Sequence, residues 1–170
     1  DMSGSMERYA RLLLAFLHQA ARGTPRQIYA FGTDLTDLNQ AFKLRDTDDM
    51  LTLASRQIQD FAGGTQLGKS LTHFRSHFAK KLTGRRTVVL LISDGLDTGT
   101  AETLDSEIVW LKRHTRSLLW LNPLLRFDGY APIATGASVL NRHVDGMLAI
   151  HNLSRLEELA QALTKLLKTN

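Results

Sequence analysis

A chain of 170 residues with 43% hydrophobic and 22% charged residues has the composition of one globular domain, which excludes a disordered or fibrous protein. It contains no cysteine, which excludes a disulfide framework, a thiolate metal site and a cysteine nucleophile and favours a reducing compartment such as the cytoplasm. The net charge of +4 comes from basic residues scattered along the chain, whose densest groups, around Lys80 and Lys112, lie near predicted helix ends, so we expect no nucleic-acid site.

The first half of the chain predicts a helix, a strand and two further helices. Apolar residues recur at helical spacing from residue 7 to residue 22, and Gly23 and Pro25 end that pattern. The apolar run within residues 27–32 predicts a short buried strand. Helical spacing returns over residues 48–59 and again over residues 67–81, so two more amphipathic helices are expected.

The second half of the chain predicts an alternation of strands and helices. The apolar residues of 87–93 do not alternate with polar ones, which predicts a strand covered on both faces. The later expected elements are helices over 102–115, 133–141 and 154–168 and strands over 118–121 and 147–150. This order predicts a doubly wound α/β fold with a mostly parallel sheet and helices on both faces, whose ligands bind at the carboxyl ends of the strands. No apolar run approaches the roughly 20 residues that cross a bilayer, so we expect no membrane span.

Hard oxygen donors occur in three loops at predicted strand ends or helix starts. Asp1, Ser3 and Ser5 alternate just before the first helix, Thr65 follows two glycines, and Asp94 ends the strongest predicted strand. Alternate residues of an extended segment point to one side, so the first loop can direct one carboxylate and two hydroxyls at a cation. Oxygen donors with few carboxylates favour Mg²⁺ or Mn²⁺ and leave positions for water or a ligand.

The motifs DMSGS, GGT and ISDG, in this order and spacing, resemble the metal-ion-dependent adhesion site (MIDAS) of von Willebrand factor A (VWA) domains. The resemblance implies that Asp1, Ser3, Ser5, Thr65 and Asp94 surround the metal, some of them through water. It also implies that an Asp or Glu of a protein partner completes the coordination shell, so the chain is a binding module and not an enzyme. By analogy with the family, we hypothesise that metal binding shifts the helix over 154–168.

Longer segments, among them SMERYARLLLAFLH, IYAFGTDLT and AIHNLSRLEELA, resemble the CoxE-type branch of this family, which comprises accessory proteins of carbon monoxide dehydrogenase and related molybdenum hydroxylases. The resemblance covers nearly the whole chain, so we expect residues 1–170 to form a single VWA-like domain. It implies a MoxR-type AAA+ ATPase as partner and a role in cofactor maturation. In the family an apolar strand precedes the first motif; we therefore expect the first strand to be truncated and the chain to be the C-terminal part of a longer protein.

Two enzymatic alternatives remain open at this stage. The segment from Gly63 to Ser70, GGTQLGKS, fits the phosphate-loop pattern of an ATPase, although the polar residues of 57–61 are unlike the buried strand that should precede it. In an ATPase Lys69 would bind phosphate, whereas in a VWA-like domain we expect it to be an exposed helix residue. A phosphatase with Asp1 as its nucleophile would need a second acid two residues later, where Ser3 stands.

Other residues have both a functional and a structural interpretation. His73 and His77 are spaced like a zinc-binding pair, but no HExxH acid accompanies them and they lie off the apolar helix face. Asp97 could support the metal from outside its coordination shell or cap the next helix. The apolar loop over residues 124–130 is a candidate partner contact. Trp110 and Trp120 lie within apolar patterns, so both are expected in the core.

Overall fold

The computed structural model describes residues 1–149 except 21, 24, 59–63 and 83. The helices are α1 (Glu7–Ala20), α2 (Thr47–Gln57), α3 (Leu67–Phe78), α4 (Ala101–Arg113) and α5 (Thr135–His143), and the strands are β1 (Tyr29–Phe31), β2 (Leu35–Asp37), β3 (Val88–Ile92), β4 (Ser117–Asn122) and β5 (Gly146–Ala149). Nearly every predicted element is present within a few residues of its expected bounds. The helix expected over 154–168 lies outside the described residues.

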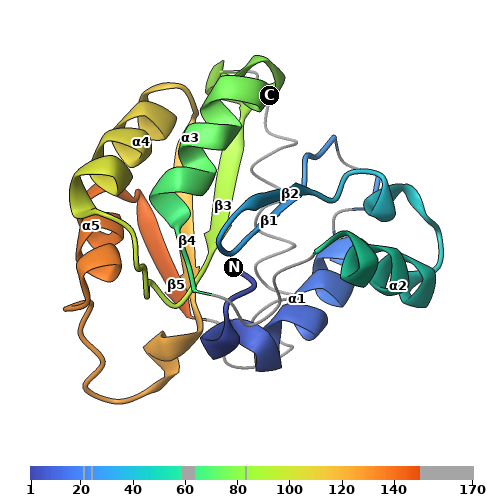
Figure 1. Ribbon diagram of the computed structural model, residues 1–170, viewed down its shortest axis with the longest axis horizontal. Helices are drawn as coiled ribbons and strands as arrows, with labels where there is room; N and C mark the ends of the chain where they lie inside the picture. Colours follow the sequence, from blue (N-terminus) through green and yellow to red (C-terminus); the bar gives the residue numbers. More distant parts are fainter. Residues whose placement is uncertain (21, 24, 59–63, 83, 150–170) are drawn as a thin grey trace.

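The strands form two hydrogen-bonded groups (Figure 1). Strands β3, β4 and β5 run parallel in that order, with Leu90 opposite Leu119 and Leu121 opposite Leu148. The pair β1 and β2 is an antiparallel hairpin that the sequence analysis did not predict. The α/β prediction with a mostly parallel sheet is therefore confirmed, with this hairpin as an addition.

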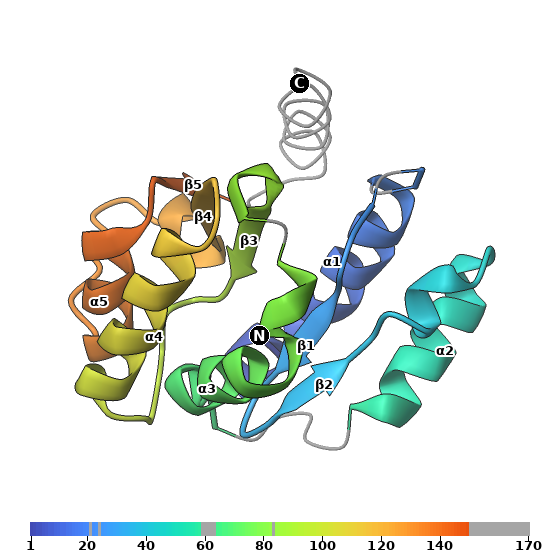
Figure 2. The ribbon, with the colours of Figure 1, turned by 90° about the horizontal axis from the view of Figure 1, so that it is seen from above.

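Helices cover both faces of β3–β5. Successive residues of a strand point to opposite faces, so the contacts of neighbouring residues in β3 show what covers each face. Leu90 and Ile92 of β3 pack with Leu13 of α1 on one face. Leu91, between them, packs in a larger cluster with residues of α3, α4 and α5, such as Ile108 and Leu140. Figure 2 shows α3, α4 and α5 on one side of the strands and α1 on the other. This double covering explains the continuous apolar run that predicted β3.

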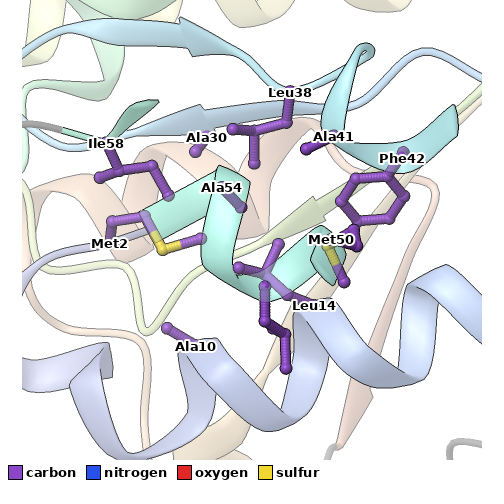
Figure 3. Close-up of a cluster of buried hydrophobic side chains, with 11 residues drawn as sticks. Met2, Ala10, Leu14, Ala30, Leu38, Ala41, Phe42, Met50, Ala54 and Ile58 are labelled. Carbon is purple, nitrogen blue, oxygen red and sulfur yellow. The ribbon is translucent and has the colours of Figure 1, made fainter. Parts of the chain in front are cut away.

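A second apolar cluster joins the hairpin to α1 through α2 (Figure 3). Met50 and Ala54 of α2 are fully buried between Ala30 of β1 and Leu14 of α1. The helix begins at Asp46, whose carboxylate accepts hydrogen bonds from the backbone N–H groups of Asp48 and Asp49. This packing fixes the hairpin and α1 relative to each other, and the first residues of the chain lie between them.

The first two residues connect the two groups of strands at their carboxyl ends. The amino group of Asp1 donates to the carbonyl oxygen of Ile92, the last residue of β3, at 3.1 Å. The backbone N–H of Met2 donates to the carbonyl oxygen of Phe31, the last residue of β1, at 2.7 Å. The segment that carries the first predicted metal-binding motif therefore lies where β1 and β3 end, as the fold class leads one to expect.

Candidate functional site

The Asp1 carboxylate lies at the centre of a set of buried oxygen atoms. Its Oδ1 accepts a hydrogen bond from the backbone N–H of Ser3 at 3.0 Å and one from the Thr65 hydroxyl at 3.3 Å. The hydroxyls of Ser3 and Ser5 lie 3.2 Å apart. Asp1, Ser3 and Thr65 are almost completely buried, whereas Ser5 is exposed. The structure thus brings residues that are 64 positions apart in the chain into direct contact.

Asp94, the fifth predicted residue, is buried directly after β3. Its Oδ1 accepts a hydrogen bond from the backbone N–H of Leu96 at 3.0 Å, which holds the turn at the strand end. Asp94 is close enough to Asp1 for its negative charge to act on the backbone nitrogen of Asp1. Its neighbour Ser93 contacts Asp1 directly. Asp94 therefore belongs to the same cluster as the first motif.

The electrostatics of the cluster favour a cation. Among the residues that the structure describes, no Lys, Arg or His forms an ion pair with the side chain of Asp1 or Asp94. Two buried carboxylates without a cationic partner are costly, because burial removes their hydration.

The donor set has the chemistry of a hard cation site. It consists of the two carboxylates and the hydroxyls of Ser3, Ser5 and Thr65, without nitrogen or sulfur. Within the described ranges, no group of three or more His, Cys, Asp or Glu residues could hold a metal ion. The cluster has only two such residues, and its remaining donors are hydroxyls, so this absence is compatible with a metal site there. Oxygen-only donors of this number fit Mg²⁺ or Mn²⁺.

Ser93 is a member of the cluster that the sequence analysis missed. Its hydroxyl donates to Oδ2 of Asp1 at 2.6 Å and accepts a hydrogen bond from the backbone N–H of Gly95 at 3.0 Å. The indole N–H of Trp120, which is fully buried as expected, donates to the carbonyl oxygen of Ser93 at 2.9 Å. Ser93 therefore orients the oxygen of Asp1 that Ser3 and Thr65 do not contact.

Residues of the loop after β3 hold the loop that carries Thr65 in place through hydrogen bonds. The backbone N–H and the hydroxyl of Thr98 both donate to the carbonyl oxygen of Thr65, each at 2.8 Å. The carboxylate of Asp97 accepts from the backbone N–H of Leu67, the first residue of α3, at 3.0 Å. The interpretation of Asp97 as a cap of the next helix is wrong, because Thr100 caps α4. Asp97 instead caps α3 and steadies the position of Thr65.

We expect Ser93→Ala to weaken both the fold and the site. The change leaves Oδ2 of the buried Asp1 carboxylate without its hydroxyl donor, which should cost about 2 kcal/mol of unfolding free energy. Loss of an orienting partner should also lower Mn²⁺ affinity about tenfold. Urea unfolding and a Mn²⁺ titration measure the two effects. The control is Ser106→Ala, at an exposed position of α4, where we expect a loss of less than about 0.5 kcal/mol; equal effects of both changes would refute the role of Ser93.

The structure disfavours the phosphate-loop interpretation of Gly63 to Ser70. Helix α2 ends at Gln57, and residues 59–63, where the strand before a phosphate loop would lie, are outside the described residues. Lys69 is exposed on α3 and pairs with Asp34 at 2.9 Å. His73 is half-buried and His77 exposed on the same helix, with their rings 4.5 Å apart and without a group of described residues that could complete a zinc site.

Searches against known proteins identify the fold class and then the family. The chain is similar to a von Willebrand factor type A structure from Catenulispora acidiphila, with a TM-score of 0.66 and 15% identity over 96% of this chain and 40% of that one. A family profile described as VWA domain containing CoxE-like protein matches residues 1–156. The chain therefore belongs to the CoxE-like family of proteins with a VWA domain. No curated protein sequence matches it.

Two further solved structures share the fold. Proximal thread matrix protein 1 from the mussel byssus has a TM-score of 0.63 at 17% identity, over 96% of this chain and 45% of that chain. The same mussel protein, described with a zinc-occupied MIDAS motif, has a TM-score of 0.54 at 17% identity, over 93% of this chain and 41% of that chain. The chain thus spans less than half the length of these structural relatives. No described helix is long and apolar enough to cross a membrane.

Proposed function

We propose that this chain binds a divalent metal through Asp1, Ser3, Ser5, Thr65 and Asp94 and uses the metal to hold a carboxylate of a protein partner. The observation that supports this most strongly is the burial of Asp1 and Asp94 without an ion pair to a described basic side chain, next to three hydroxyls. A cation at this point offsets the cost of burying two negative charges. The zinc-occupied MIDAS motif of a protein with the same fold agrees with a divalent metal.

Some residues of the site orient the Asp1 carboxylate, and another leaves the site open to solvent. Asp1 is held by hydrogen bonds on both oxygens, from Ser3 and Thr65 on one and from Ser93 on the other, so its carboxylate is preorganised. Ser5 is exposed and lies next to Ser3, so the ring of donors is open to solvent on its side. When bound, the metal would supply a positive charge with an open coordination position for an Asp or Glu of the partner. Partial burial strengthens that contact.

For the biological partner, we propose a MoxR-type AAA+ ATPase, and for the process, maturation of a molybdenum hydroxylase such as carbon monoxide dehydrogenase. Membership of the CoxE-like family supports this assignment. We propose a binding module and not an enzyme, acting in the cytoplasm, with Mg²⁺ or Mn²⁺ as the metal. The oxygen donors favour these two ions, and the absence of cysteine fits a reducing compartment.

A titration of Mn²⁺ into the metal-free chain, followed by electron paramagnetic resonance, tests the metal site. We expect one bound Mn²⁺ per chain, displaced by Mg²⁺. Because the metal binds the folded state, a concentration of about 100 times its dissociation constant should add about 2.7 kcal/mol to the unfolding free energy. Binding of no metal, or of metal without any stabilisation against unfolding, would contradict the proposal.

A further inference from the structure

The fold brings together two basic groups that lie far apart in the sequence. Lys80 belongs to a 3₁₀ turn at the end of α3 (Ala79–Lys81), and Arg113 is the last residue of α4. Both helices end at the amino ends of β3 and β4, where the backbone N–H of Arg116 donates to the carbonyl oxygen of Thr87 at 2.8 Å. These helix ends are at the top of Figure 1, at the opposite end of the strands from Asp1.

A cavity of about 520 Å³ opens between these helix ends. Its apolar lining comes from Ala79, Leu82 and Trp110, and its basic lining from Lys80, Arg113 and His114. Among the described residues, no ion pair neutralises Lys80 or Arg113, and both side chains are exposed. The cavity therefore combines apolar lining residues with two basic side chains that have no described ion pair.

Trp110, which was expected in the core, packs against the core cluster but is itself only partly buried. The guanidinium of Arg75 lies over its ring at 5.2 Å from the centroid, and the His114 ring stacks on it at 4.5 Å with an interplanar angle of 24°. These contacts fix the indole at the edge of the cavity. A tryptophan held in place beside arginines is the composition typical of the energetic centre of a protein interface.

We infer that this cavity is a second interaction site, which binds an acidic protein segment that inserts one apolar side chain beside Trp110. The exposed cations complement the acidic residues, and the cavity is large enough for a single apolar side chain. A peptide fits better than a nucleic acid, because Arg75 and His114 already cover the Trp110 ring and leave less of it for stacking on bases. The site lies away from the metal cluster and does not depend on it.

Fluorescence anisotropy with a labelled peptide, in which glutamates flank one phenylalanine, tests the inference on the whole chain. We expect binding that is unchanged by EDTA and weakened about tenfold or more by Lys80→Glu with Arg113→Glu. The matched control, Arg11→Glu with Arg45→Glu, reverses the same number of exposed charges elsewhere and should leave the affinity unchanged. A peptide with alanine in place of phenylalanine should bind more weakly.

Four results would contradict the proposed site. The first two are failure of the peptide to bind at all and an equal loss of affinity in both double variants. The other two are loss of binding in EDTA and binding of the alanine peptide with the same affinity as the phenylalanine peptide. Competition by a single-stranded oligonucleotide or by tripolyphosphate as strong as that by unlabelled peptide would overturn the assignment to an acidic protein segment. Because Lys80 and Arg113 are exposed, their substitution should not prevent folding, and circular dichroism checks this point.

Discussion

Substitution of Asp1 by Asn is expected to reduce Mn²⁺ affinity by about 100-fold or more. The amide has nearly the shape of the carboxylate and keeps an oxygen that can accept from Ser3 and Thr65, so the local fold should survive. The change removes one of the two negative charges that face the metal. Isothermal titration calorimetry with Mn²⁺ measures the loss, and the unfolding free energy without metal checks that the variant is folded.

The matched control for this substitution is Asp48→Asn, which removes a carboxylate from the exposed first turn of α2. It raises the net charge of the protein by one unit, as Asp1→Asn does, so a general electrostatic effect would appear in both variants. We expect wild-type Mn²⁺ affinity for Asp48→Asn. Wild-type affinity for Asp1→Asn would place the metal elsewhere and refute the assignment of Asp1.

Substitution of Gly95 by Ala is expected to destabilise the protein by about 2–4 kcal/mol. Gly95 has a φ of +82°, which costs a non-glycine residue about 1 kcal/mol. A Cβ atom there would lie 2.8 Å from the Cβ of Ala137 and 2.9 Å from the ring of Trp120, both buried, and such overpacking costs about 1–3 kcal/mol. Because Gly95 follows Asp94 directly, the resulting shift should also weaken metal binding.

Gly129→Ala separates the cost of the positive φ from the cost of the close packing. Gly129 has a similar φ of +79° but no atom within 4 Å of the position that a Cβ would take. Urea unfolding of both variants should therefore show a loss of only about 1 kcal/mol for Gly129→Ala. Equal losses for the two variants would mean that the close packing of Gly95 against Ala137 and Trp120 does not constrain the loop after β3.

Sequence patterns could predict the elements that bury a long apolar face. The helices could be predicted because their apolar residues recur every three or four positions, which places them on one buried face. Strand β3 could be predicted because its apolar run is continuous, as in a strand that is covered on both faces. The hairpin strand β2 could not be predicted, since its three residues, Leu35–Asp37, are all only partly buried and show no alternation. Trp110 was expected in the core because the spacing of apolar residues places it on the apolar face of α4. Spacing does not show how far the buried part of that face extends.

Much of the candidate site was accessible from the sequence because its donors occur in short motifs next to strand ends and helix starts. The contacts that hold these donors were not accessible. Ser93 contacts Asp1 across 92 positions, and Asp97 contacts Leu67 across 30. Such pairings depend on how the strands are ordered in space, and no local pattern in the chain encodes that order. The basic groups around Lys80 and Lys112 were evident in the sequence, but for the same reason their meeting in space was not.

Binding to a purified MoxR-type AAA+ ATPase, measured by biolayer interferometry in Mg²⁺ and in EDTA, tests whether the protein holds its partner through the metal. We expect binding in Mg²⁺ that is lost in EDTA and lost in the Asp1→Asn variant, while Asp48→Asn binds like the wild type. Binding of equal strength in Mg²⁺ and EDTA would contradict the claim that the metal holds the partner's carboxylate.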